Sequence, residues 1–118
     1  MDTMMKIKDI SAALVLFEES AAKQAEATEL GDYKAGNKYY DKVVEAANFL
    51  KATNSIDKIR GFLSHSSVGV RMWAAAYSLP FDEKEATKIL REIINGSGIH
   101  ALTAETTLME WQKGNLKF

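Results

Sequence analysis

A histidine and three serines are the residues with catalytic potential that stand closest together in this 118-residue sequence. His65 lies among Ser64, Ser66 and Ser67, while His100 stands apart from them. A catalytic triad assembles from distant segments and needs an acid to orient the histidine, so adjacency alone does not predict one. Neither histidine has a second metal ligand three or four residues away. We therefore expect a turn at His65, a surface or half-buried position for His100, and serines that cap the following helix.

Acidic residues are plentiful, but most alternate with lysines or stand where helices should begin. A carboxylate there interacts favourably with the helix dipole, so the simpler interpretation is a solvated face. The alternative is an acidic patch of Glu26, Glu29 and Asp32 near the end of the first helix. Such a patch would face a basic protein partner and would accelerate association more than it adds affinity.

The composition excludes several classes of function. The sequence contains no cysteine, which rules out disulfides, thiol catalysis and cysteine-bound zinc. The net charge of −1 supplies no basic field for a phosphate backbone, which argues against nucleic-acid binding. The apolar run from Ala12 to Phe17 is too short to cross a membrane. We expect a cytoplasmic protein that is not an enzyme, with no cofactor, no catalytic residue and no metal site.

The spacing of apolar residues predicts a single all-α domain over residues 1–118, with six helices in three antiparallel pairs. The first helix should run from about Ile7 to Leu30 and stop at Gly31. Asp32 should cap the second helix, which ends near Thr53 and Asn54. Its apolar residues are Tyr33, Tyr40, Val43, Val44, Ala47 and Leu50.

The remaining four helices follow at short intervals. The third should bury Ile56, Ile59, Phe62 and Leu63, and the fourth should run to about Ser78. It ends there because a residue before proline, here Leu79 before Pro80, resists helical geometry. Asp82 should cap the fifth helix, and the sixth should stop at Gly114.

The segment Phe62 to Leu79 resembles a HEAT repeat, with a polar turn followed by Val70-Arg71 and Ala74-Ala75. The segments Ile59 to Leu79 and Ile89 to Met109 resemble each other at an offset of about 30 residues, shorter than the roughly 40–47 of HEAT units. A right-handed HEAT-like stack would line one shallow concave face with the second helix of each pair.

The chain as a whole is similar to a family of small bacterial helical-repeat proteins catalogued as a domain of unknown function. The shared residues include Phe17 and Gln24, Ala35-Gly36-Asn37-Lys38, Leu63-Ser64-His65, Ala86 with Leu90, and Trp111-Gln112-Lys113-Gly114. Members and look-alikes occur among immunity proteins of contact-dependent toxin systems. The resemblance implies a protein that binds and neutralises a cognate toxin domain, such as a nuclease.

Aromatic residues are the first candidates for contacts with such a partner, because they are enriched at binding hot spots. Trp73 and Tyr77 are four residues apart on one helix face. The neighbouring Tyr39 and Tyr40 cannot both point into a core. The expected contact set also includes Arg71 and His100. For Trp73 and Tyr77 a position in the core of a small domain is the more ordinary alternative. The alternatives are an adaptor for other proteins and, least favoured, a nucleic-acid binder.

Overall fold

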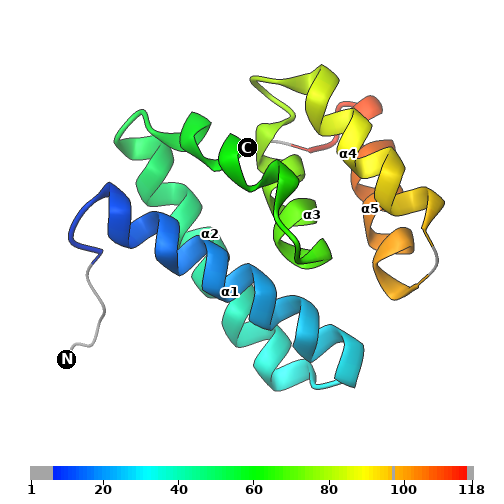
Figure 1. Cartoon of the computed structure of the whole chain (residues 1–118), viewed down its shortest axis with the longest axis horizontal. Helices are drawn as coiled ribbons and strands as arrows, with labels where there is room; N and C mark the ends of the chain where they lie inside the picture. Colours follow the sequence, from blue (N-terminus) through cyan, green and yellow to red (C-terminus); the bar gives the residue numbers. More distant parts are fainter. Residues whose placement is uncertain (1–6, 97, 117–118) are drawn as a thin grey trace.

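The computed structural model describes residues 7–96 and 98–116, and its regular structure there is entirely helical (Figure 1). Six helices occur in these residues and no strand, which confirms the all-α class. In chain order they are α1 (Ile10–Leu30), α2 (Tyr33–Ala52), the 3-10 helix η1 (Ile56–Ser64), α3 (Val68–Ser78), α4 (Glu83–Asn95) and α5 (Ile99–Gln112). None of these described helices is both long enough and apolar enough to cross a membrane.

Local capping sets the limits of the two long helices. Oδ1 of Asp9 accepts a hydrogen bond from the Ala12 backbone N–H (2.8 Å), so α1 begins after Asp9, slightly later than expected. Gly31 ends α1 with φ of 71°, a left-handed conformation that glycine adopts without strain. Asp32 then caps α2 through the Ala35 N–H (3.1 Å). The expected stop and cap are therefore both present, and α2 lies beside α1 (Figure 1).

The third helix forms where expected but is a 3-10 helix. Its apolar residues Ile56, Ile59 and Phe62 are three apart, which the three-residue turn of a 3-10 helix aligns on one side. Ile59 is fully buried, and the ring of Phe62 stacks against that of Phe17 with centroids 6.0 Å apart. The spacing thus suits this tighter helix.

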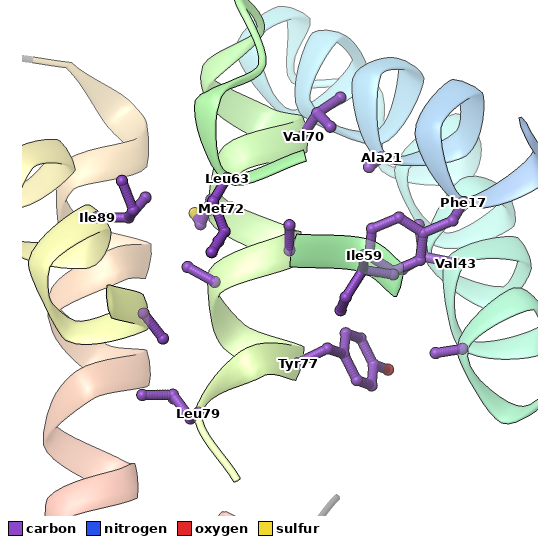
Figure 2. Packing of buried hydrophobic residues seen from close by; sticks show 14 of the residues in the cluster. Phe17, Ala21, Val43, Ile59, Leu63, Val70, Met72, Tyr77, Leu79 and Ile89 are labelled. Atoms are coloured by element: carbon purple, nitrogen blue, oxygen red, sulfur yellow. The ribbon is translucent and has the colours of Figure 1, made fainter. Parts of the chain in front are cut away.

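The short helix α3 forms the centre of the core, with neighbours on both sides. Val70 and Tyr77 point towards α1 and α2, whereas Met72, and Leu79 just after the helix, lie on the side of the α4–α5 pair (Figure 2). A helix surrounded in this way must be apolar around most of its circumference, and eight of its residues are buried. The α4–α5 pair therefore packs on the α1–α2 pair mainly through α3.

Gly69 allows α3 to approach α1 closely. A Cβ atom at this position would lie 2.3 Å from Cβ of Ala25 and 3.1 Å from the carbonyl oxygen of Ala21. Only glycine opposite alanine permits this separation of the two backbones.

The end of α3 lies at Ser78 as expected, although the reason differs from the one given by the sequence. Leu79, the residue before Pro80, retains right-handed helical angles (φ −51°, ψ −44°). The helix stops because Pro80 has no N–H with which to continue the hydrogen-bond ladder.

Candidate functional site

Both ring nitrogens of His65 are used within the fold. The Ser67 backbone N–H donates to Nδ1 of His65 (2.9 Å), so the ring proton resides on Nε2 and is donated to Oε2 of Glu18 (2.7 Å). A histidine held in this way has no lone pair to offer a metal or a substrate proton. His65 instead ties the turn before α3 to α1.

His100 is buried at the start of α5, where its Nε2 lies 2.7 Å from Oε2 of Glu29. With 7% of its surface exposed, His100 offers little area to a partner and instead connects α5 with the end of α1. The two histidines therefore both contact glutamates of α1, at Glu18 and Glu29.

Of the three serines expected to cap the helix after His65, Ser67 does so, whereas Ser64 lies in η1 and Ser66 is exposed. Oγ of Ser67 accepts a hydrogen bond from the Val70 N–H (3.3 Å) and caps α3, as expected. Within residues 7–96 and 98–116, no group of three or more histidine, aspartate and glutamate side chains could hold a metal ion.

Arg71 faces away from the aromatic residues of α3. Its Nη1 donates to the carbonyl oxygens of His65 (2.7 Å) and Ser66 (3.2 Å), which fixes the turn that precedes its own helix. Arg71 also lines an open cleft of about 890 Å³ between η1 and α4. Four acidic and four basic side chains line this cleft, so it has no dominant charge: Asp57, Asp82, Glu85, Glu92, Arg60, Arg71, Lys84 and Lys88.

Three of the expected contact residues form one aromatic cluster between α2 and α3. The Trp73 ring lies 5.5 Å from that of Tyr40 and 6.3 Å from that of Tyr77, centroid to centroid. Nε1 of Trp73 donates to Oε1 of Gln24 on α1 (3.1 Å). Tyr40 is exposed and Trp73 half-buried, so these two form the accessible part of the cluster.

Tyr77 forms the inner part of this cluster, with only 7% of its surface exposed. Burial, with a smaller contribution from the charge of Tyr40, raises the pKa of Tyr77 to about 12. The Nζ atom of Lys51 lies 5.2 Å from the centre of its ring. Tyr77 therefore supports the exposed aromatic residues from below and offers a partner little surface.

Tyr39 lies on a different side of α2 from Tyr40. The ammonium groups of Lys23 and Lys38 lie 5.6 and 5.4 Å from the centre of its ring. The expected contact set is thus divided: Tyr40 and Trp73 form a surface, whereas Tyr39, Arg71, Tyr77 and His100 lie elsewhere or beneath it.

The turn between α1 and α2 lies near the first turn of α5 (Figure 1). Residues of both segments line a groove of about 490 Å³. We call it the α1–α5 groove. Its apolar lining residues Leu30, Tyr33 and Ile99 are 77%, 83% and 51% exposed. Ala27 and the buried Gly36 also line it, together with the polar side chains Gln24, Thr28 and Asn37.

The charged residues that line the α1–α5 groove are Glu29 and Asp32, two members of the acidic patch considered from the sequence. Glu26, the third member, lines an adjoining pocket of about 230 Å³ together with Asp32, Lys23 and Tyr39. The patch is therefore divided between two hollows: the charges that line the α1–α5 groove are only acidic, whereas the adjoining pocket also contains Lys23.

Sequence reasoning missed this groove because it assigned Tyr33 to the apolar face of α2. Tyr33 is 83% exposed although it shares the apolar spacing of the later α2 residues Val43, Ala47 and Leu50, which are buried in the core. Leu30 and Tyr33 flank the turn residues Gly31 and Asp32, and apolar residues on both sides of an exposed turn were the available signal.

Comparison of the chain with protein-family models, with curated proteins and with solved structures gave no significant match.

Proposed function

We propose that this chain is an immunity protein: a cytoplasmic inhibitor that binds a bacterial toxin domain, such as a nuclease, and blocks its active site. It carries out no reaction itself. Its partner is a protein rather than a nucleic acid or a membrane, and it needs no cofactor. The resemblance of its sequence to small bacterial helical-repeat proteins, some of them immunity proteins, motivates the choice of a toxin as the partner.

One observation supports a binding role above all: apolar and aromatic side chains are exposed together around a groove, while the histidines are held inside the fold. Leu30, Tyr33 and Ile99 surround the α1–α5 groove. His65 and His100 are each bound to a glutamate of α1. Exposed apolar groups that gather at one place are typical of interaction sites, whereas scattered ones are ordinary.

The finer architecture in this proposal is a right-handed HEAT-like stack of antiparallel helices. The pairing of α1 with α2 and of α4 with α5, with α3 between the pairs, supports it. In such a stack a protein partner would contact Tyr40 and Trp73 on α2 and α3, together with the groove beside them. Tyr77 and His100 would act indirectly, by supporting those contacts.

Co-purification tests this proposal. The tagged chain, isolated from its own bacterium, should retain one protein in a 1:1 complex, and expression of that protein alone should arrest growth. The complex should survive about 1 M NaCl, where the Debye length falls to about 3 Å and surface charge attraction is screened. Co-expression of the chain should restore growth.

Alanine substitutions at two equally exposed residues test whether the surface around Tyr40 binds the partner. Tyr40 is 47% exposed and Met109, on α5, is 46% exposed. Tyr40→Ala should weaken the complex about tenfold or more, as expected for an aromatic contact, and Met109→Ala should not. Partners that are many, weak and harmless when expressed alone would refute the inhibitor role and favour the adaptor.

A further inference from the structure

The chemistry of the α1–α5 groove points to the kind of segment that it binds, within the protein-binding role proposed above. We propose that it receives a basic segment of the partner protein: a bulky apolar side chain enters the groove, and lysine or arginine residues flank it.

The apolar part of this inference rests on the lining. Leu30, Tyr33 and Ile99 present their side chains around a hollow of about 490 Å³, a size within the range of roughly 300–1,000 Å³ typical of ligand pockets. Gly36 deepens the groove, since the nearest atom that an added Cβ would meet is Cβ of Ala27, 4.0 Å away. A large aliphatic or aromatic side chain would cover surface that now faces water.

The basic part rests on two fixed carboxylates. Asp32 caps α2 through the Ala35 N–H, and Glu29 contacts Nε2 of His100. Each of these bonds uses one oxygen, and a carboxylate can accept from several donors at once. Both charges are therefore held in place before a partner arrives, and a cationic side chain can pair with them without reordering the groove.

The aromatic cluster extends this site. Gln24 lines the groove and accepts the hydrogen bond from Trp73, while Asn37 lies three residues before Tyr40 on α2. The groove is therefore continuous with the exposed ring of Tyr40, which can receive a lysine or arginine over its face. A phosphate-bearing ligand would instead meet Glu29 and Asp32, and like charges repel it.

The test uses the full chain and three synthetic peptides. The first alternates tryptophan and leucine with lysine and arginine, the second has glycine and serine in place of the apolar residues, and the third has glutamate in place of the basic ones. Amide NMR shifts should move at Leu30, Gly31, Gly36 and Ile99 with the first peptide, and its affinity should exceed that of the other two. Equal binding of the second peptide, or shifts centred outside the groove, would overturn the proposal.

The chain offers a matched control for the charges. The double variant Glu29→Gln with Asp32→Asn neutralises the groove while it retains a hydrogen-bonding amide and a good helix cap. The double variant Glu18→Gln with Asp9→Asn makes the same changes at another histidine contact and another N-cap. The first should weaken the basic peptide about three- to tenfold, as expected for two exposed charge pairs, and the second should leave its affinity unchanged. Equal losses would refute a role for the groove charges.

Apolar variants separate this inference from the inhibitor role. Leu30→Ser and Ile99→Ser should each reduce peptide affinity several-fold, whereas Val15→Ser, at an apolar position on α1 that is as exposed as Ile99, should not. If the captured partner tolerates both groove variants but is lost with Tyr40→Ala, the groove proposal is wrong and the inhibitor role stands. If no growth-arresting partner is found while the peptide binds as described, the groove assignment stands and the inhibitor role falls.

Discussion

Two glutamates of helix α1 each contact a histidine, and a buried glycine lies near each contact. The two places differ in how closely the neighbouring helix packs against α1. At the first, His65 contacts Glu18 and Gly69 lies against Ala25. At the second, His100 contacts Glu29, eleven residues or about three turns further along. The buried glycine near this second contact is Gly36 of α2.

The space available for an added Cβ atom differs between the two glycines. At Gly69 a Cβ atom would lie 2.3 Å from Cβ of Ala25, whereas at Gly36 the nearest neighbour is 4.0 Å away. The first place is closed by the side chains of the core, and the second opens into the α1–α5 groove. The same local pattern, a histidine–glutamate contact near a glycine, thus holds the domain together at one place and leaves a binding surface at the other.

Gly69→Ala should have the largest effect on stability. The methyl group must displace α1 from α3, and overpacking costs roughly 1–3 kcal/mol; a separation of 2.3 Å places this case at the upper end, about 3 kcal/mol, against a gain of about 1 kcal/mol from replacing glycine in a helix. Urea denaturation should show a net loss of about 2 kcal/mol. Gly61→Ala is the control, since no atom lies within 4 Å of its added Cβ. An unchanged midpoint for Gly69→Ala would mean that α1 and α3 are further apart than described.

The dependence of folding stability on alkaline pH tests whether Tyr77 is buried. Its pKa of about 12 in the folded chain exceeds the ordinary value of 10.0. The folded state therefore holds the phenol proton more strongly, so its contribution to stability is complete below pH 10 and is lost as the pH rises towards 12. The free energy of unfolding, measured by urea denaturation, should fall by up to about 2 kcal/mol between pH 10 and pH 12.

Tyr77→Phe is the control for this alkaline loss, because phenylalanine has no ionisable group. The difference between the two proteins should grow between pH 10 and pH 12, and tyrosinate absorbance should show one group that titrates last. A wild-type protein whose stability falls in parallel with that of Tyr77→Phe would contradict the assignment.

The two histidine–glutamate contacts should contribute similarly and modestly. Each glutamate is exposed enough for water to compete, so double-mutant cycles to alanine should give coupling energies of about 0.5–1 kcal/mol for Glu18–His65 and for Glu29–His100. A coupling above about 2 kcal/mol would indicate a buried charge pair rather than a surface contact. His65→Ala should lower the free energy of unfolding by more than the coupling energy between His65 and Glu18, because the Ser67 N–H also loses its acceptor.

The sequence predicted most, but not all, of the features that depend on neighbouring residues. The expected cap at Asp82 is an exception, because its side chain makes no capping hydrogen bond to α4 and pairs with Arg60 (3.1 Å). Gly31 stops α1, Asp32 caps α2 and Ser67 caps α3, since each acts within four residues. The buried residues Phe17 and Ala21 are four apart, which fits the helical spacing from which the first helix was expected. The 3-10 geometry of η1 was not predicted, although its three-residue apolar spacing was visible.

The candidate site was harder to predict because it depends on contacts between distant residues. His65 lies 47 residues from Glu18, and His100 lies 71 residues from Glu29, so no local pattern pairs them. Tyr33 and Tyr40 have the periodicity of buried residues, yet both are exposed, whereas Val43, Ala47 and Leu50 further along α2 are buried. Periodicity identifies the apolar face of a helix, but it does not tell which part of that face other elements cover.

Gly36→Ala should have the smallest effect, with the opposite sign to Gly69→Ala. The methyl group would lie in ordinary contact 4.0 Å from Ala27, and alanine reduces the conformational freedom of the unfolded chain, so stability should rise by about 0.5 kcal/mol. The same methyl group would make the α1–α5 groove shallower, so the basic peptide should bind slightly less tightly while the urea midpoint rises. Destabilisation instead would mean that α1 and α2 are as tightly packed at Gly36 as α1 and α3 are at Gly69. In that case the contrast between the two places along α1 would fail.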